Sequence, residues 1–508
     1  MEAIEGLIQG FQVAMLAENL LAALIGAALG TAVGVLPGLG PLGGAALVLP
    51  FTYSMEPTAA IIMIAGIYYG GMYGGSTTSV LLNVPGETAS VVTTLDGYPL
   101  TQKGRAGPTL FIMAIGSAVA AFISLVLLTF FSPWLARFGL RFGPAEFFAV
   151  MTCGLIVLSR VSGGSLMSNL FPLMIGIVAG TVGQEAVSSA VRFTFGYFPL
   201  IAGLELVALA IGLFGLAEVL RLVENPAGTP RVKTVRVRDM VPSREEFSRS
   251  VGPWGRGSLV GFVFGLLPGP SAAMSSYASY QLEKKVARGR AEMGKGAIEG
   301  VAGPEAANNA AATSGMIPVL SLGLPFSATL ALILAALMIH GIQPGPLLPI
   351  QHPDIFWGVI ASMFVGNIML LMLNIPMIGV WVSMLKVPIW LLGAIVIVIA
   401  VVGTFAARNN LTDVYVLTGA AAAGYFLHKL GFNLAPLILG FVLGPEIEKH
   451  LRQGLYLSNG DLTYFIERPI AATLWGITIL TFLVVFLWRR FFGERARELD
   501  AIESGDDE

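Results

Sequence analysis

Long runs of sequence without any Asp, Glu, Lys or Arg constrain this chain more than any other feature. They cover residues 19–55, 57–86, 106–136, 257–282, 306–339, 355–385, 387–407 and 469–488. A membrane-spanning helix needs about 20 consecutive apolar residues, whereas a soluble core does not need runs of this length. The sequence therefore predicts an all-α polytopic membrane protein, with about ten to twelve transmembrane helices plus re-entrant or broken helices.

The composition excludes several classes of function. Charged residues make up 12% of the chain, about half the share usual in soluble proteins, and the net charge of -2 does not favour nucleic acid as a partner. A single cysteine, Cys153, excludes an internal disulfide or a site built from several thiolates. The histidines (His340, His352, His428 and His450) lack metal-ligand spacing, and the sequence has no Walker A motif and no hydrolase motif. We therefore expect neither an enzyme nor a transition-metal site.

The basic residues indicate which loops face the cytoplasm. They cluster in residues 231–249, 284–290 and 489–497, and cytoplasmic loops of membrane proteins are enriched in Lys and Arg. The amino terminus lacks the basic region of a signal peptide, so we expect a retained first helix. The predicted organisation is a first transmembrane half at 1–223, a basic cytoplasmic loop at 224–254, a second transmembrane half at 255–492 and a charged cytoplasmic tail at 493–508.

Two tandem sets of glycines indicate that these halves are related. Gly26, Gly30 and Gly34 lead into residues 35–38 (VLPG), and Gly257, Gly261 and Gly265 lead into residues 266–269 (LLPG). A spacing of four places small residues on one helix face, where a neighbouring helix can approach closely, and the proline then ends the helix. A second match relates residues 83–88 (NVPGET) to 323–328 (GLPFSA). These matches predict an internal repeat, and they leave open whether its halves are inverted or parallel.

The proline-containing breaks are candidate binding elements for an anionic substrate. Very few Lys or Arg lie inside the predicted spans, so an anion would instead meet the unpaired N–H groups and positive dipole of a half-helix N-terminus. Interrupted hydrophobic segments at matching positions are also typical of the binding site in secondary transporters. The predicted substrate-binding residues are Pro37, Gly38, Gly40, Ser76, Thr77, Asn83, Pro85, Gly86, Thr88, Pro268, Gly269, Ser271, Pro325, Ser327 and Thr329.

Polar residues between the breaks are candidate ligands for a cation. The predicted cation-binding residues are Glu305, Asn308, Asn309 and Thr313, which would share one helix face. Pro304 would then stand in the first turn of that helix. Carboxylate, amide and hydroxyl oxygens are hard ligands of the kind that Na⁺ prefers, and hydrogen bonding between helices is the alternative role for these groups. We expect Na⁺ or H⁺ as the coupling ion and no other cofactor.

Two further polar groups are interpreted from local pattern alone. Ser76, Ser79 and Asn83 follow i, i+3, i+7 spacing, which would place them on one face of a helix. Asp96, in residues 95–99 (LDGYP), is expected to be a turn residue.

Six short motifs are distinctive as an ordered set. They are residues 34–41 (GVLPGLGP), 69–76 (YGGMYGGS), 83–87 (NVPGE), 96–99 (DGYP), 300–309 (GVAGPEAANN) and 340–346 (HGIQPGP). The set covers both halves and resembles the large membrane subunit of the tripartite tricarboxylate transporter family. The resemblance implies a multi-pass protein of the bacterial inner membrane that imports small di- or tricarboxylates together with a cation. It also implies two partner proteins, a small membrane subunit and a periplasmic substrate-binding protein.

One position departs from the family pattern. Members commonly have Gly after the proline of the second Leu-Pro motif, where this chain has Phe326. We expect the ring to narrow or reshape the substrate pocket. The leading hypothesis is a permease that works by alternating access, with its site between the two halves. A channel or scaffold subunit that allows only downhill flux is the alternative.

Overall fold

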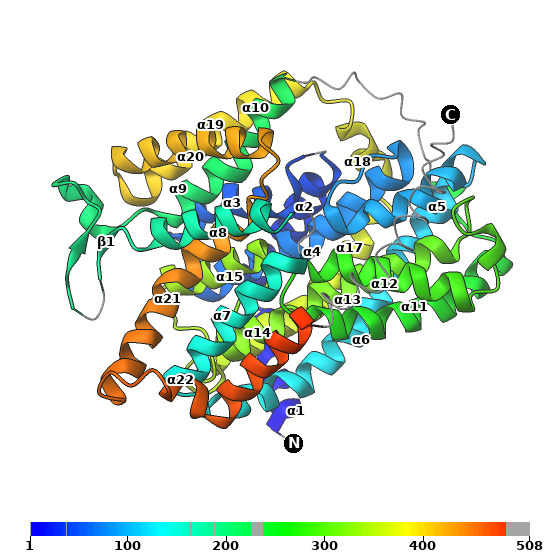
Figure 1. Ribbon diagram of the computed structural model, residues 1–508. Helices are drawn as coiled ribbons and strands as arrows, with labels where there is room; N and C mark the ends of the chain where they lie inside the picture. The colour runs from blue at the N-terminus through cyan, green and yellow to red at the C-terminus, as the bar shows by residue number, and fades with distance from the viewer. Residues whose placement is uncertain (1, 37, 162–164, 186–187, 225–236, 484–508) are drawn as a thin grey trace, which may run out of the picture.

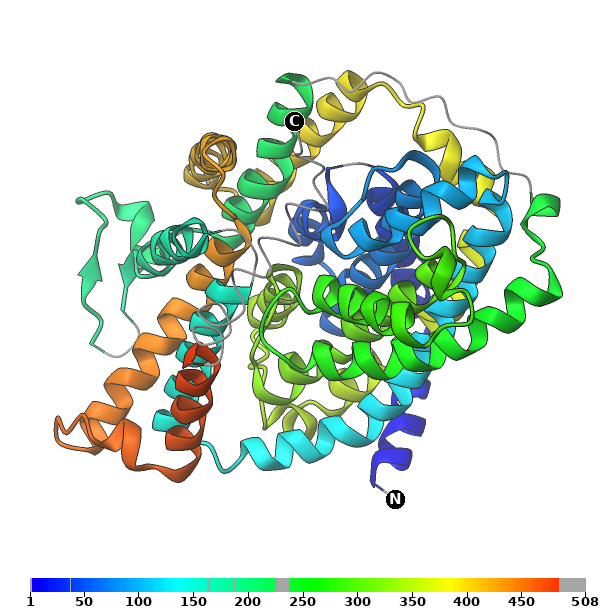
Figure 2. The same cartoon turned by 45° about the vertical axis from the view of Figure 1, so that its right-hand side comes forward.

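The computed structural model describes residues 2–36, 38–161, 165–185, 188–224 and 237–483. Within these residues the chain is helical except for loops and one short antiparallel strand pair, which pairs Gly183 with Arg192 and Gln184 with Val191. The strand pair projects from the helical body, on the side opposite α11 and α12 (Figures 1 and 2). The predicted all-α class is confirmed.

The elements follow one another in four groups. The first is α1 (Glu2–Ala14), α2 (Ala17–Val35), α3 (Gly40–Thr52), α4 (Pro57–Leu82), η1 (Thr88–Ser90), α5 (Val91–Gln102) and α6 (Ala106–Gly139). The second is α7 (Pro144–Val161), α8 (Leu166–Gly180), β1 (Gly183–Gln184), β2 (Val191–Arg192), η2 (Phe198–Ala202), α9 (Leu206–Ala210), η3 (Ile211–Leu216) and α10 (Ala217–Glu224). The third is η4 (Val237–Met240), α11 (Arg244–Gly265), α12 (Ser271–Val286), η5 (Arg290–Glu292), α13 (Glu299–Ser314), α14 (Met316–Leu322), α15 (Ala328–Ile339), α16 (Leu348–Gln351) and α17 (Pro353–Asn374). The fourth is α18 (Ile378–Met384), α19 (Ile389–Arg408), α20 (Leu411–Lys429), α21 (Ala435–Leu457) and α22 (Tyr464–Glu467).

Several helices are long and apolar enough to cross a membrane. Five meet both criteria within the described residues: Ala17–Val35, Ala106–Gly139, Leu206–Glu224, Pro353–Asn374 and Trp390–Arg408. Shorter apolar helices lie at Gly40–Thr52, Leu166–Gly180, Ala328–Ile339 and Pro469–Leu483. This pattern supports a multi-pass membrane protein, while the total of ten to twelve spans stays a prediction.

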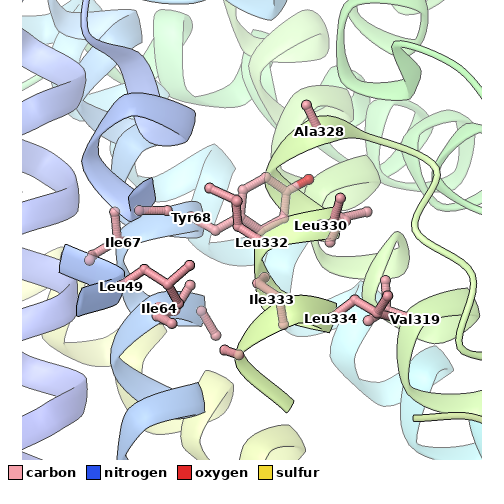
Figure 3. Close-up of a cluster of buried hydrophobic side chains, with 14 of the residues drawn as sticks. Leu49, Ile64, Ile67, Tyr68, Val319, Ala328, Leu330, Leu332, Ile333 and Leu334 are labelled. Carbon is pink, nitrogen blue, oxygen red and sulfur yellow. The ribbon is translucent and has the colours of Figure 1, made fainter. Parts of the chain in front are cut away.

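Helix α4 lies at the centre of the molecule. Every one of its residues is buried except the first, Pro57, and the last, Leu82. One of its faces packs on α15, where the ring of Tyr68 lies beside Leu332 and its hydroxyl points towards Ala328 (Figure 3). A helix that is buried on all sides has no face exposed to solvent, and this is consistent with the absence of charged residues from α4.

Both glycine sets lie against the backbone of a neighbouring helix. A Cβ on Gly26, Gly30 or Gly34 of α2 would lie 2.4, 2.5 or 2.3 Å from the carbonyl oxygens of Met63, Ile67 and Gly71 in α4. A Cβ on Gly257, Gly261 or Gly265 of α11 would lie 2.3, 2.2 or 2.4 Å from the carbonyl oxygens of Gly303, Ala307 and Ala311 in α13. Since real Cβ atoms do not approach carbonyl oxygens this closely, only glycine permits these two helix contacts.

The pair α2–α4 and the pair α11–α13 run in opposite directions. Within each pair the two helices are parallel, because the contacted residue numbers increase in the same direction along both helices. Helix α4 is also parallel to α17, since Thr58 lies by Gly358 and Tyr73 by Asn367.

Helix α6 links the two pairs. It is antiparallel to α17, since Ala118 contacts Asn367 and Phe122 contacts Phe364. It is parallel to α13 and α14, since Ser117 contacts Asn309 and Ser132 contacts Ser321. Helix α13 is therefore antiparallel to α4. The interpretation of these pairs as an internal repeat stays a prediction.

One local prediction is wrong. Helix α13 begins at Glu299, so Pro304 lies inside it rather than in its first turn, and Ser276 of α12 donates to the Pro304 carbonyl at 3.1 Å. The segment 224–254 contains η4 and the start of α11, where Ser243 and Glu246 form a capping box, and its assignment as a basic cytoplasmic loop stays a prediction. Residues 225–236 of that loop, and the predicted tail at 493–508, lie outside the described residues.

Candidate functional site

Each of the four predicted breaks is followed by a new helix. Helices α3, α12 and α15 begin at Gly40, Ser271 and Ala328, and η1 begins at Thr88 and continues into α5. Pro37 lies outside the described residues. Gly38 and Gly40, on either side of Leu39, have φ of +96° and +59°, a region that glycine enters without a steric penalty.

The segments 83–87 and 323–327 share one backbone conformation. Asn83 and Gly323 end α4 and α14 in the left-handed region, with φ of 59° and 70°. Four residues later, Glu87 and Ser327 are extended N-cap residues, with φ/ψ of -149°/167° and -139°/160°. The matched sequence segments therefore make matched turns.

The predicted substrate-binding residues divide between exposed and buried positions. Gly38, Asn83, Pro85 and Thr88 are exposed, and Gly40, Pro268 and Ser327 are half-buried. Ser76, Thr77, Gly86, Gly269, Ser271, Pro325 and Thr329 are buried. Asn83 does not share a helix face with Ser76 and Ser79, because α4 ends before it. The expectation of one polar face on α4 is wrong at that residue.

Glu305 is the one predicted cation ligand with a carboxylate, and it lies fully buried on α13. Its Oε2 accepts a hydrogen bond of 2.6 Å from Ser76 of α4, and its Oε1 accepts a short one from Thr93 of α5. Within the described residues it forms no ion pair with Lys or Arg. A buried carboxylate that meets only neutral donors is costly as an anion, so this arrangement favours a bound cation or proton.

Asn308 points towards the turn of the first half. Its Nδ2 donates to Oε1 of Glu87 at 3.0 Å, while its Oδ1 is buried and has no hydrogen-bond partner within the described part of the chain. Glu87 is half-buried and, among the described residues, also lacks an ion pair. Two carboxylates and one unused amide oxygen therefore flank the same stretch of α13, which is a ligand set of the kind hard cations prefer.

Asn309 and Thr313 face another neighbour. Asn309 donates to Ser117 Oγ of α6 at 2.8 Å and to the carbonyl of Glu305 at 3.0 Å. Thr313 donates to the carbonyl of Asn309 at 2.9 Å. The structure thus brings Glu305 and Asn308 towards the first half through α4, α5 and the 83–87 turn, and brings Asn309 and Thr313 against α6.

Several residues of this region were missed by sequence reasoning. They are Tyr69, Tyr73, Glu87, Thr93, Ser117 and Asn367. Glu87 stands inside the quoted motif at residues 83–87, so its carboxylate next to a predicted break was an available signal. Thr93, Ser117 and Asn367 carry no such signal, because their partners are distant in the chain.

Phe326 lines a small apolar cavity of about 10 Å³ at the second turn. The cavity lies between this turn, the break at Pro268, helix α7 and helix α21, and is lined by Met151, Gly154, Leu155, Leu158, Pro268, Leu324, Pro325, Phe326, Leu439 and Leu443. About one water molecule fits a space of this size. The expectation that the ring narrows or reshapes the substrate pocket stays a prediction.

Asp96 holds the loop that precedes α13. It is fully buried within α5 and accepts hydrogen bonds from the backbone N–H groups of Gly294, Gly296 and Ala297 at 2.7–3.0 Å and from Tyr280 Oη at 3.0 Å. The expectation of a turn residue is wrong, because residues 91–102 continue as a helix through Pro99. Asp96 instead fixes where the chain enters α13, and so helps to position Glu305 and Asn308.

The sequence is similar to known proteins over most of its length. A family model described as the tripartite tricarboxylate transporter TctA family matches residues 20–439. An Agrobacterium vitis protein named "Uncharacterized 52.8 kDa protein in TAR-I ttuC' 3'region" is 43% identical over 487 residues, which cover 96% of this chain and 97% of that protein. A second, "Uncharacterized protein in TAR-II ttuC' 3'region" of the same organism, is 46% identical over 227 residues, 45% of this chain and 94% of that protein. No solved structure matches the chain.

Proposed function

Because the chain belongs to the tripartite tricarboxylate transporter TctA family, we propose that it is the permease subunit of a secondary active, cation-coupled importer of small carboxylates. The family makes it a multi-pass membrane subunit of a transporter. The proposal adds a place in the bacterial inner membrane, coupling to Na⁺ or H⁺, and assembly with a small membrane subunit and a periplasmic substrate-binding protein.

The observation that carries the proposal is the buried Glu305 carboxylate. It lies between α13 and the helices α4 and α5, and within the described residues its hydrogen-bond donors are the hydroxyls of Ser76 and Thr93. Desolvating an unpaired carboxylate costs several kcal/mol in general, of the order that a bound cation or proton offsets. A site of this kind between the two glycine-packed helix pairs is where a coupling ion can respond to their relative movement.

Two helix N-termini at the breaks support a site for the substrate carboxylate. Among the described residues, α3 and α12 begin without a side-chain cap, whereas Ser327 caps α15 by accepting from Leu330 N at 3.3 Å. Unsatisfied N–H groups and the positive end of the helix dipole attract anions. An anion can therefore be held here although the spans contain very few Lys or Arg.

The opposite directions of the α2–α4 and α11–α13 pairs support alternating access. Carriers with inverted halves open to one side and then the other by rocking one half against its counterpart around a central site. Phe326 and Pro268, which share one small cavity, limit the space at the second-half breaks. We therefore propose dicarboxylates as better substrates than tricarboxylates.

Transport by the reconstituted three-component system tests this function. Proteoliposomes containing the chain, the small membrane subunit and the binding protein should accumulate substrate against its gradient when a Na⁺ or proton gradient is imposed. Ser76→Ala should lower this accumulation, because it removes a donor to Glu305. Ser79→Ala is the matched control, since the Ser79 hydroxyl donates to Gly75 O of its own helix and, in the described part of the chain, not to Glu305. Purely downhill flux in the wild type would support the channel or scaffold alternative instead.

A further inference from the structure

A second cavity, with polar groups in its lining, lies beside Asn309 of α13. It measures about 10 Å³ and is enclosed by α4, α6, α13 and α17. Its lining residues are Tyr69, Tyr73, Ala121, Leu125, Asn309, Thr313, Met363, Asn367 and Leu370. Five of these side chains carry oxygen, and none carries a charge, so the cavity is a chemically separate environment from the Glu305 carboxylate.

Apart from the Tyr69 hydroxyl, the hydrogen-bond donors that line this cavity are committed elsewhere. Tyr73 donates to Asn367 Oδ1 at 3.0 Å, and Thr313 donates to the backbone of its own helix. Asn309 uses its amide hydrogens on Ser117 and Glu305, and Asn367 donates to Ala118 O at 3.0 Å. What remains is mainly the lone pairs of hydroxyl and amide oxygens, which suit a cation better than an anion.

Tyr69 provides an independent observation. Its side chain is only 7% exposed, it lines the cavity, and its hydroxyl has no hydrogen-bond partner within the described residues. Burying a hydroxyl without a partner costs about 1–3 kcal/mol. The cost is avoided when a species in the cavity contacts the hydroxyl oxygen.

We propose that this cavity is a second cation site, which binds one Na⁺ through the neutral oxygens of Tyr69, Tyr73, Asn309, Thr313 and Asn367. Asn308 and Asn309 then serve different ions, one beside Glu305 and Glu87 and the other in the neutral cavity. Adjacent residues on a helix point about 100° apart, so one dipeptide can supply both sites. The proposal rests on the cation coupling proposed above, and it adds a second ion and a residue set of its own.

Binding of ²²Na⁺ to the purified, assembled transporter tests the second site. We expect two Na⁺ per chain in the wild type and one in the double variant Tyr69→Phe/Thr313→Val. In uptake, the Hill coefficient for Na⁺ should fall from about 2 to about 1, since it cannot exceed the number of interacting sites. The single variant Thr313→Ser keeps both hydroxyls and should therefore still bind two Na⁺ if the double variant loses the second ion through lost ligands rather than through misfolding.

A matched control is available on α6. Thr129 is a buried threonine that donates to a carbonyl of its own helix, as Thr313 does, but it does not line the cavity. Thr129→Val should therefore leave two bound Na⁺. The second site would be overturned if the wild type and the double variant each bound one Na⁺. The proposed function would still stand if the cation gradient drove uptake in both. No bound Na⁺ together with downhill flux would overturn both.

Discussion

The turn at residues 83–87 and the turn at residues 323–327 share a backbone path but differ in their surroundings. In the first, Asn83 and Pro85 are exposed, and Glu87 reaches Asn308 of the other glycine-packed pair. In the second, Pro325 is buried, Phe326 lines an apolar cavity, and Ser327 caps the helix that follows. The same fold element thus presents a polar, accessible surface in one place and an apolar, closed one in the other.

One position explains much of this difference. A Cβ on Gly86 would lie 2.4 Å from Gly75 Cα and 2.6 Å from Gly34 O, so the first turn is pressed against the backbones of α2 and α4. The equivalent Phe326 is directed into the space beside Pro268. The turn conformation therefore does not require glycine at this position, whereas the close packing of the first turn against α2 and α4 does.

The largest expected effect comes from testing that position. Gly86→Ala should destabilise the protein by about 3 kcal/mol, the upper end for overpacking against a backbone that cannot yield. The yield of monodisperse, purified protein measures the effect. Phe326→Ala should keep the protein folded and shift uptake towards larger carboxylates. If Gly86→Ala and Phe326→Ala lost the same amount of folded protein, the two turns would not differ in how tightly they are packed.

The glycine contacts of the two helix pairs should behave alike. Gly30→Ala in α2 and Gly261→Ala in α11 should each cost about 2 kcal/mol, because both new Cβ atoms would meet a carbonyl oxygen. Gly255→Ala on α11 is the control, since a Cβ there meets nothing within 4 Å. Thermal unfolding of the three variants would measure these costs. A large cost in only one pair would count against matched packing.

The two N-cap residues should separate transport from stability. Glu87→Gln should lower cation-dependent uptake about tenfold, which corresponds to 1.4 kcal/mol, by removing a carboxylate beside Asn308. Ser327→Ala should cost about 1 kcal/mol of stability through the lost cap and leave the cation dependence unchanged. Uptake measured over a range of Na⁺ concentrations distinguishes the two. Normal cation dependence in Glu87→Gln would exclude Glu87 from the ion site.

The smallest expected effect is a pH dependence of stability that arises at the start of α11, where Glu246 pairs with Arg105. Partial burial of Glu246 at the start of α11 opposes its ionisation, but hydrogen bonds from Arg105 and Ser243 outweigh this, so the pKa of Glu246 is lowered. A lowered pKa adds stability above the unfolded-state value, about 4.3, and this stability is lost as the pH falls through the lowered pKa.

The measurement is thermal unfolding at pH 7 and in the acid range. Glu246→Gln should lower stability at pH 7 by less than about 1 kcal/mol, as expected for a partly exposed ion pair, and should reduce the acid sensitivity. Glu245→Gln is the control, because Glu245 is 80% exposed. The same acid sensitivity in wild type and Glu246→Gln would show that this ion pair does not contribute.

The sequence alone was sufficient for features that depend on neighbours along the chain. Charge-free runs predicted a helical membrane protein, and the Leu-Pro-Gly segments predicted where helices end, because a proline blocks the helix locally. Asp96 and Pro304 were misinterpreted for the opposite reason. Each occurs in a pattern typical of a turn or helix start, yet each lies within a helix and meets partners brought there by the fold.

The tertiary structure alone decided how the candidate site is assembled. Ser76 and Glu305 are 229 residues apart, Glu87 and Asn308 are 221 apart, and Ser117 and Asn309 are 192 apart. No local pattern encodes such pairings, because they depend on which helix packs against α13 and in which direction it runs. The sequence determined the class of protein, the broken helices and the glycine faces, whereas helix packing decided that the adjacent Asn308 and Asn309 face different hydrogen-bond partners.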